Sequence, residues 1–165
     1  MPDTERQLHP FPPLYDNASR ILILGSFPSV KSREGQFFYH HPQNRFWKVL
    51  AGVLGVPVPV TIEEKSAMLH AHHIALWDVI ASCEIAGSSD SSIRNVVPND
   101  LSPIFSDASI QAVFCNGGAA YNFYRKYTEA HTMFAAKKLP STSPANAAWS
   151  IERLVDAWTD ILLWL

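Results

Sequence analysis

The chain has 165 residues, of which 47% are hydrophobic and 12% aromatic, and 13 Lys and Arg residues face 15 Asp and Glu residues. This length is typical of one domain, and the hydrophobic content is sufficient for a substantial core. The formal net charge of −2 argues against a protein that coats nucleic acid through bulk electrostatics, and the only cysteines, Cys83 and Cys115, lack the close spacing of zinc or four-cysteine iron–sulfur sites.

The first nineteen residues contain four prolines and no apolar run long enough for a signal sequence. We expect residues 1–19 to form an N-terminal arm on the surface of a single domain that spans 1–165. The chain is expected to be a cytoplasmic monomer with no membrane contact.

Two buried strands and two helices are predicted in the first half of the chain. The apolar run at 20–24 ends at Gly25 and is typical of a strand that is buried on both faces. Helical spacing of apolar residues predicts a helix at 43–54, and Thr61 with Glu64 forms a capping box for a second helix at 62–71. A further buried strand is predicted at 74–77.

The second half begins with a stretch rich in Ser, Asn and Asp at 81–102, which is expected to form long loops with room for one short helix. Strands at 110–115 and 133–139 flank another helix, and a long amphipathic helix at 149–165 closes the chain. This alternation predicts an α/β fold, a three-layer α/β/α sandwich with a central four-stranded parallel sheet. Ligands bind such sheets at the carboxyl ends of the strands, so the loops after Leu24 and Leu139 are expected to carry the chemistry.

Those two loops contain the most specific motifs. The first reads Gly25-Ser26-Phe27-Pro28-Ser29, followed by His41-Pro42-Gln43-Asn44-Arg45-Phe46-Trp47, and the second contains Pro140-Ser141-Thr142-Ser143-Pro144-Ala145-Asn146. The first segment resembles the mismatch-specific uracil-DNA glycosylases, and the second is similar to the Pro-Ser loop with which that superfamily enters the minor groove. Phe27 stands where the mismatch-specific enzymes have a catalytic Asn, so the pattern is closest to the hypoxanthine-DNA glycosylase branch.

The resemblance implies a monofunctional DNA-deoxyinosine glycosylase that hydrolyses the N-glycosidic bond of deaminated bases in double- or single-stranded DNA. Hypoxanthine is the first expected base and uracil the second. Extrusion of a base costs roughly a few kcal/mol and is easiest at a mismatched or damaged pair. No motif places a lysine for a Schiff base, and no metal or other cofactor is expected.

The expected catalytic residues are Asn44, which the resemblance to the hypoxanthine branch implies, and Ser26 and His40, which the chemistry of bond cleavage favours. Asn44 would bind the base or orient water, although an Asn before a helix is often only a cap. The backbone amides of the Ser26 turn would stabilise the departing base, and His40 is a candidate proton donor. His41, which precedes Pro42, is expected instead to orient the start of the helix. The substrate-binding set is Gly25, Phe27, Pro28, Ser29, Phe38 and Tyr39, with Tyr39 as the stacking aromatic residue.

The second loop is expected to bind DNA through Ser141, Ser143, Pro144, Ala145, Asn146 and Lys137. Ser143 is the best phosphate ligand, and Ala145 aligns with the wedge residue, for which a methyl group is small. In the alternative interpretation this loop only caps the last helix, with Asn146 as its N-cap. Six basic residues near the two loops would form an anion-binding face if the loops meet, and these are Lys31, Arg33, Arg45, Lys48, Lys137 and Lys138.

Several alternatives remain open from the sequence. The enzyme could be a uracil or mismatch-specific DNA glycosylase, a non-catalytic nucleic-acid-binding relative, or a protein that binds a small nucleotide. Asp78 and Asp90 are second-choice activators of water, because Asp beside Ser in a loop is usually a turn or cap residue.

Overall fold

A central sheet of four parallel strands organises the molecule. The computed structural model describes residues 5–165. The strand order is β3 (Ile74–Asp78), β2 (Ile21–Gly25), β6 (Ala112–Asn116) and β7 (Ala136–Leu139). Every residue of β2 and β3 is buried, as continuous apolar runs require of strands covered on both faces. The expected four-stranded parallel sheet is confirmed.

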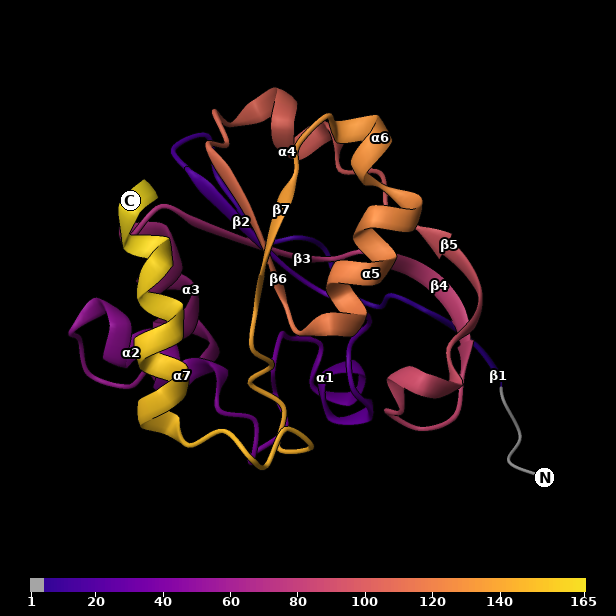
Figure 1. Cartoon of the computed structure of the whole chain (residues 1–165), viewed down its shortest axis with the longest axis horizontal. Helices are drawn as coiled ribbons and strands as arrows, with labels where there is room; N and C mark the ends of the chain where they lie inside the picture. The colour runs from indigo at the N-terminus through magenta and orange to yellow at the C-terminus, as the bar shows by residue number, and fades with distance from the viewer. Residues whose placement is uncertain (1–4) are drawn as a thin grey trace.

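Helices cover both faces of this sheet and complete the predicted three-layer sandwich (Figure 1). One side carries α2 (Phe46–Leu54), α3 (Ile62–Ala71) and α7 (Ile151–Trp158), and the chain then ends in the 3-10 helix η2 (Thr159–Trp164). The other side carries α5 (Gly118–Tyr127) with α4 (Ser102–Asp107) and α6 (Glu129–Thr132). None of the described helices has the length and apolar character needed to cross a membrane.

A second, antiparallel sheet was not expected. It consists of β1 (Glu5–Leu8), β4 (Ile80–Ile85) and β5 (Arg94–Pro98), with β4 in the middle. Long loops at 81–102 were therefore a wrong prediction, although the short 3-10 helix η1 (Asp90–Ser92) lies between the two new strands. The small helix α1 (Val30–Gly35) also lies in a segment where none was predicted.

The N-terminal segment is more deeply integrated than a surface arm. Residues 1–4 of the expected arm lie outside the described residues, and β1 pairs along its whole length with β4. Beyond the strand, the side chain of His9 is almost completely buried, and Phe11 belongs to the hydrophobic core. The segment therefore packs against the carboxyl end of β3.

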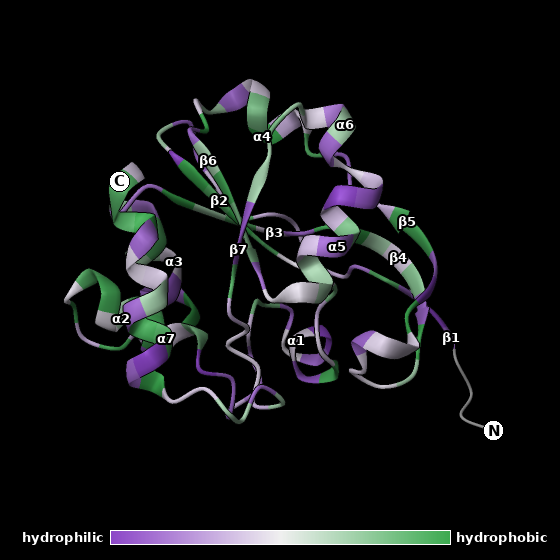
Figure 2. Cartoon of the chain, in the orientation of Figure 1, coloured by the Kyte–Doolittle hydropathy of each residue, from purple (hydrophilic) through white to green (hydrophobic). Residues whose placement is uncertain are grey.

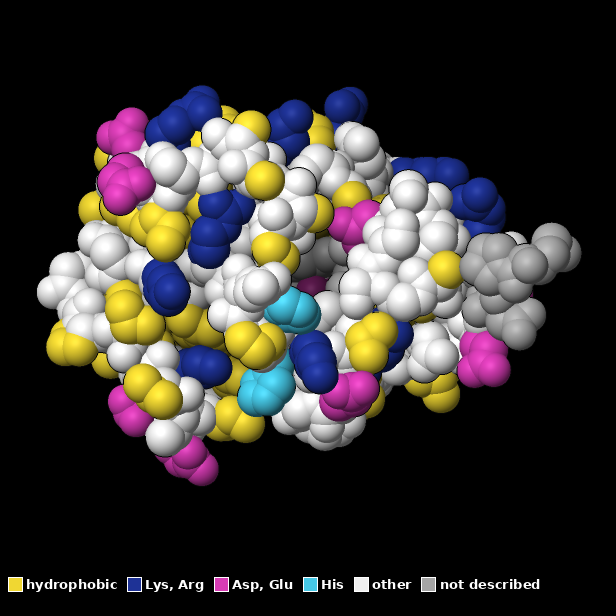
Figure 3. Space-filling view, turned by 90° about the horizontal axis from the view of Figure 1, so that it is seen from below, with side chains coloured by type: hydrophobic (Ala, Val, Ile, Leu, Met, Phe, Trp, Pro, Cys, Tyr) yellow, Lys and Arg dark blue, Asp and Glu magenta, His cyan; other side chains and the backbone are white. Residues whose placement is uncertain are grey.

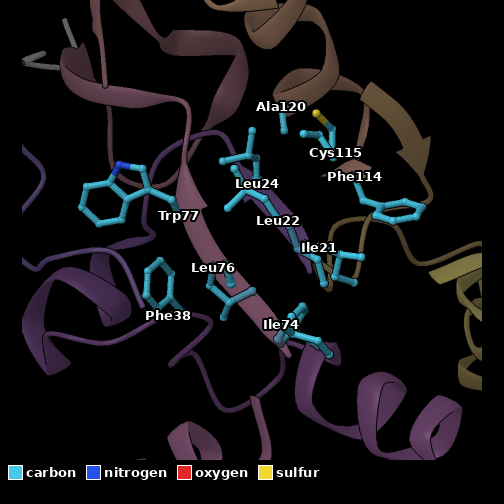
Figure 4. Close-up of a cluster of buried hydrophobic side chains, with 14 of the residues drawn as sticks. Ile21, Leu22, Leu24, Phe38, Ile74, Leu76, Trp77, Phe114, Cys115 and Ala120 are labelled. Carbon is cyan, nitrogen blue, oxygen red and sulfur yellow. The ribbon is translucent and has the colours of Figure 1, made fainter. Parts of the chain in front are cut away.

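The core is built from the central strands and the helix faces turned towards them. β2 and β6 are mainly hydrophobic in Figure 2, whereas the edge strand β7 has a hydrophilic stretch. The labelled side chains in Figure 4 show residues of β2, β3 and β6 packed together with Phe38 and Ala120. Cys83 and Cys115 are both buried and free, and burial raises the pKa of the Cys115 thiol to about 12. This rigid sheet fixes the positions of the loops that leave its carboxyl end.

Candidate active site

The loops predicted from the two motifs meet at one cavity. It encloses about 350 Å³ at the carboxyl ends of the parallel strands, a volume sufficient for a single nucleobase. The view in Figure 3 faces this end of the molecule and shows a hollow with histidine, Lys and Arg side chains around it. Twelve of the fifteen predicted site residues line the cavity, namely Gly25, Ser26, Phe27, Pro28, Ser29, Phe38, Tyr39, Asn44, Ser141, Ser143, Pro144 and Ala145.

A buried threonine connects the two loops. Thr142 is completely inaccessible to solvent, and its hydroxyl donates a hydrogen bond of 2.9 Å to Oδ1 of Asn44. The same hydroxyl accepts a bond of 3.0 Å from Nδ2 of Asn116, whose Oδ1 in turn accepts from the Thr142 backbone amide. Asn44 lies in the segment after β2, and Asn116 is the last residue of β6. Thr142 therefore fixes three segments of the chain relative to one another.

Asn44 also bonds the first residue of α2. Its Oδ1 accepts a bond of 2.9 Å from the backbone amide of Phe46, which opens α2, in addition to the bond from Thr142. Both donors require an oxygen at that position, so the side-chain orientation of Asn44 is determined. Its amide nitrogen donates to no described residue and is the group left for a ligand.

Arg45 holds the second loop in place. Its guanidinium donates to the backbone carbonyls of Ser143 at 2.9 Å, Asn146 at 3.0 Å and Trp149. The Arg45 backbone amide donates to the carbonyl of Thr142 at 3.1 Å. A planar guanidinium can serve several carbonyls at once, which an ammonium cannot do with the same geometry. Arg45 is therefore occupied within the protein rather than free to bind phosphate.

Aromatic side chains form one wall of the cavity. Tyr39 stacks on Phe46 with ring centroids 4.0 Å apart and an interplanar angle of 21°. The backbone of Tyr39 is left-handed, with φ of 50°, an uncommon conformation for a bulky residue. Its hydroxyl oxygen is buried and has no hydrogen-bond partner among the described residues. Burial and the nearby Asp78 charge both raise the pKa of Tyr39, so the hydroxyl keeps its proton.

The turn after β2 offers free backbone donors. The amides of Ser26, Phe27 and Ser29 donate to no other described residue, and all three residues line the cavity. The Ser26 hydroxyl donates at 2.8 Å to Asp90, which also lines the cavity. Burial of the Asp90 carboxyl raises its pKa and the bond from Ser26 opposes that shift, although much of the residue is exposed at the cavity mouth.

Three predicted residues lie outside this cavity. His40 is exposed and packs against Gly35 at the end of α1, so the structure does not place it with the other candidates. Asn146 donates to the Ser141 carbonyl at 3.0 Å and stabilises the loop from behind. Lys137 lies in the edge strand β7 with its ammonium 4.9 Å from the centre of the Trp164 ring. His41 does line the cavity, and its Nδ1 accepts from the Gln43 amide as an orienting role requires.

Two residues that the motifs did not select lie at the inner end of the cavity. Asp78 is the last residue of β3, lines the cavity and is 4% exposed, and its Oδ2 lies 2.7 Å from Nε2 of His9. Asn116, the last residue of β6, also lines the cavity. The position of Asp78 at a strand's carboxyl end was a usable signal, but nothing in the sequence paired it with His9, 69 residues away.

Other potential sites do not coincide with the motifs. A larger hollow of about 680 Å³ lies between α4 and the end of α5, and it contains none of the predicted site residues. No group of three or more His, Cys, Asp or Glu side chains within residues 5–165 is arranged to hold a metal ion.

Comparison with known proteins agrees with this arrangement. Residues 12–162 match the model of the uracil DNA glycosylase superfamily. The chain is 33% identical over 144 residues to a hypoxanthine DNA glycosylase of Methanosarcina acetivorans, covering 87% of this chain and 90% of the relative. A hypoxanthine DNA glycosylase of Methanosarcina barkeri is 32% identical over 109 residues, covering 65% of this chain and 69% of the relative.

A solved structure has the same fold. The solution NMR structure of a candidate uracil DNA glycosylase from Methanosarcina acetivorans superposes with a TM-score of 0.77 at 30% identity, covering 92% of this chain and 96% of that one. The family match spans both loops of the cavity as well as the central sheet. The chain therefore belongs to the uracil DNA glycosylase superfamily.

Proposed function

We propose that the protein is a DNA-repair glycosylase that hydrolyses the N-glycosidic bond of deoxyinosine and releases hypoxanthine, with uracil as a second substrate. The observation that carries this proposal is the single cavity of about 350 Å³ shared by the Gly25–Ser29 and Ser141–Ala145 loops. Two of its relatives are hypoxanthine DNA glycosylases. A base must leave the duplex stack to enter such a site.

The aromatic wall would hold the extruded base. One face of the Tyr39 ring is covered by Phe46, which fixes the ring and leaves its other face available for stacking. Phe38 lies deeper and is 3% exposed, so it supports the wall from the core. A rigid aromatic surface binds a flat base with little loss of side-chain entropy.

Charge stabilisation would come from the turn after β2. Cleavage develops positive charge on the sugar and negative charge on the departing base. The free amides of Ser26, Phe27 and Ser29 can donate to the base as an oxyanion hole does. The amide nitrogen of Asn44 is the remaining donor of the motif and would bind the base or orient the attacking water.

The second loop would anchor the DNA strand. The Ser143 and Ser141 hydroxyl oxygens accept bonds from backbone amides within the loop, at 3.2 and 3.1 Å, which leaves their hydroxyl protons available to phosphate oxygens. Ser143, Pro144 and Ala145 line the cavity, whereas Lys137 lies elsewhere. No lysine lines the cavity among the described residues, which supports hydrolysis by water without a Schiff base.

Single-turnover kinetics on short duplexes test the proposal. Duplexes with deoxyinosine are expected to release hypoxanthine without added metal, and borohydride is expected to trap no DNA adduct. Asn44→Ala should reduce the rate at least a hundredfold while the fold persists, whereas the neighbouring exposed Gln43→Ala should behave like the parent protein. Retained DNA affinity with no release of hypoxanthine or uracil would refute the proposal in favour of a non-catalytic binder.

A further inference from the structure

A second hollow adjoins the base cavity at the Ser141–Ala145 loop. It encloses about 560 Å³, and Asp90, Ser141, Ser143 and Ala145 line both hollows. The remaining walls of this second hollow, the outer groove, come from the start of α5, the end of β7 and the segment that precedes α7. The two hollows therefore share one side of the second loop.

The position of the outer groove matches the path of a DNA strand. A nucleotide whose base occupies the cavity remains joined through its phosphate to a neighbour in the same strand, so that neighbour must lie directly beside the cavity. Ser143 lines both hollows and therefore lies at their junction, where a phosphate that links the two nucleotides would pass. The outer groove begins at this junction and is large enough for a further nucleobase.

Lys138 gives the outer groove a positive charge. Side chains alternate along β7, so Lys138 lines the groove while the Lys137 ammonium lies over the ring of Trp164. The Lys138 ammonium forms no ion pair with any described residue, and its nitrogen lies 5.8 Å from the centre of the Tyr121 ring. Asp90 also lines the groove, but it lies at the junction with the cavity. The free ammonium is therefore available to a phosphate group.

Trp149 gives the same groove a rigid apolar surface. Its carbonyl accepts a bond from Arg45, and its backbone amide donates to the carbonyl of Asn146 at 3.2 Å. The Arg153 guanidinium lies 4.2 Å from the centre of the indole ring and also donates to the carbonyl of Ala148 at 3.2 Å. The half-buried ring is therefore held in place from several sides. Such an aromatic surface binds a base with little loss of side-chain entropy.

We propose that the outer groove binds the nucleotide next to the lesion in the same strand, with Lys138 on its phosphate and Trp149 against its base. The inference rests on the proposed function, because the cavity must hold the lesion base. In a duplex the neighbouring base stays paired, and only its phosphate reaches the groove. In a single strand that base is free to contact Trp149, so this contact strengthens the binding of single strands more than that of duplexes.

The salt dependence of binding tests the phosphate contact. Affinity is measured by fluorescence anisotropy with a single-stranded oligonucleotide that carries 2′-fluoro-deoxyinosine, an analogue that resists hydrolysis. Lys138→Gln should make the slope of log affinity against log salt concentration shallower by about 0.7, the value for one lost phosphate contact on a single strand. Lys137→Gln removes the same charge from the same strand and should leave the slope unchanged. An unchanged slope in Lys138→Gln would overturn the inference.

A Trp149 variant tests the contact with the base. Trp149→Leu keeps an apolar side chain and should lower the affinity for the single strand about tenfold, and that for the duplex less than about threefold. Trp164→Leu is the control, because Trp164 is also half-buried under a cation, Lys137, but lies outside the groove. If Trp149→Leu lowers both affinities by the same factor, the ring only supports the loop and the inference is wrong.

Oligonucleotides that end at the lesion identify the neighbour. Removing the nucleotides on one side of the lesion should abolish the effects of both variants, and removing those on the other side should preserve them. Effects that persist on both shortened strands, or that occur only on duplexes, would overturn the inference. Failure of the proposed function gives a different pattern: a protein that releases no base can still show these differences in affinity, whereas an active glycosylase without them refutes only the role of the groove.

Discussion

Removal of the Thr142 hydroxyl should weaken the contact between the two loops and lower the free energy of unfolding. Thr142→Val keeps the shape of the side chain but removes the group that donates to Asn44 and accepts from Asn116. Asn44 keeps its bond from Phe46, so loss of the Thr142 bond costs about 1 kcal/mol. The amide nitrogen of the half-buried Asn116 loses its acceptor, which costs about 1–3 kcal/mol more. The expected loss in the free energy of unfolding is therefore about 2–4 kcal/mol.

Urea denaturation measures this loss, and Thr142→Ser is the matched control. Serine keeps the hydroxyl and removes one buried methyl group, which should cost about 1 kcal/mol. Single-turnover rates on deoxyinosine duplexes should fall in Thr142→Val and remain near the parent value in Thr142→Ser. If Thr142→Val unfolds at the same urea concentration as the parent protein, the hydroxyl does not hold the loops together.

Three further changes probe the same site. Arg45→Lys should reduce excision more than tenfold and accelerate amide hydrogen exchange in residues 141–149, because an ammonium cannot reach the three carbonyls, whereas Lys48→Met on the exposed face should change neither. Gly25→Ala should abolish measurable excision because its methyl group would collide with Asp78, while Gly118→Ala, where a Cβ meets no atom within 4 Å, should retain it. Burial raises the pKa of Asp90 above its ordinary 3.8, so the folded protein holds this proton to higher pH than the unfolded chain. The free energy of unfolding should therefore fall as the pH rises from 3.8 through the raised value. Asp90→Asn should remove that part of the pH dependence of urea unfolding, and a pH profile unchanged by the substitution would contradict this reasoning.

The strands β2 and β3 of the central sheet could be predicted because they are buried on both faces. A run such as Ile21–Leu24 has no polar position, so the pattern is unambiguous, and its end at Gly25 marks the functional loop. The antiparallel sheet could not be predicted in the same way. β1 has the polar sequence Glu-Arg-Gln-Leu, and β5 is largely exposed and contains Asn95 in a left-handed conformation, so neither strand shows clear alternation.

The residues of the candidate site could be predicted where they belong to motifs that are continuous in the sequence. The segment from His41 to Trp47 and the loop from Ser141 to Ala145 both contribute to the cavity. The sequence could not show that His41 and Tyr39 line the cavity while His40 lies outside it, since this depends on the left-handed turn at Tyr39. The pairing of His9 with Asp78 depends on the path of the N-terminal segment past β4, which no local pattern encodes.

Phe27, the aromatic residue in the first motif, belongs to an apolar enclosure around the His9 ring. Phe27, which stands where the mismatch-specific enzymes have a catalytic Asn, is 8% exposed and lies edge-on to the His9 ring at 6.1 Å. With Phe11 and Trp77 it encloses the imidazole and keeps water from competing for the bond to Asp78. A polar side chain at position 27 would need its own partner in this enclosure. Phenylalanine at position 27 therefore fits the apolar surroundings of the His9 ring.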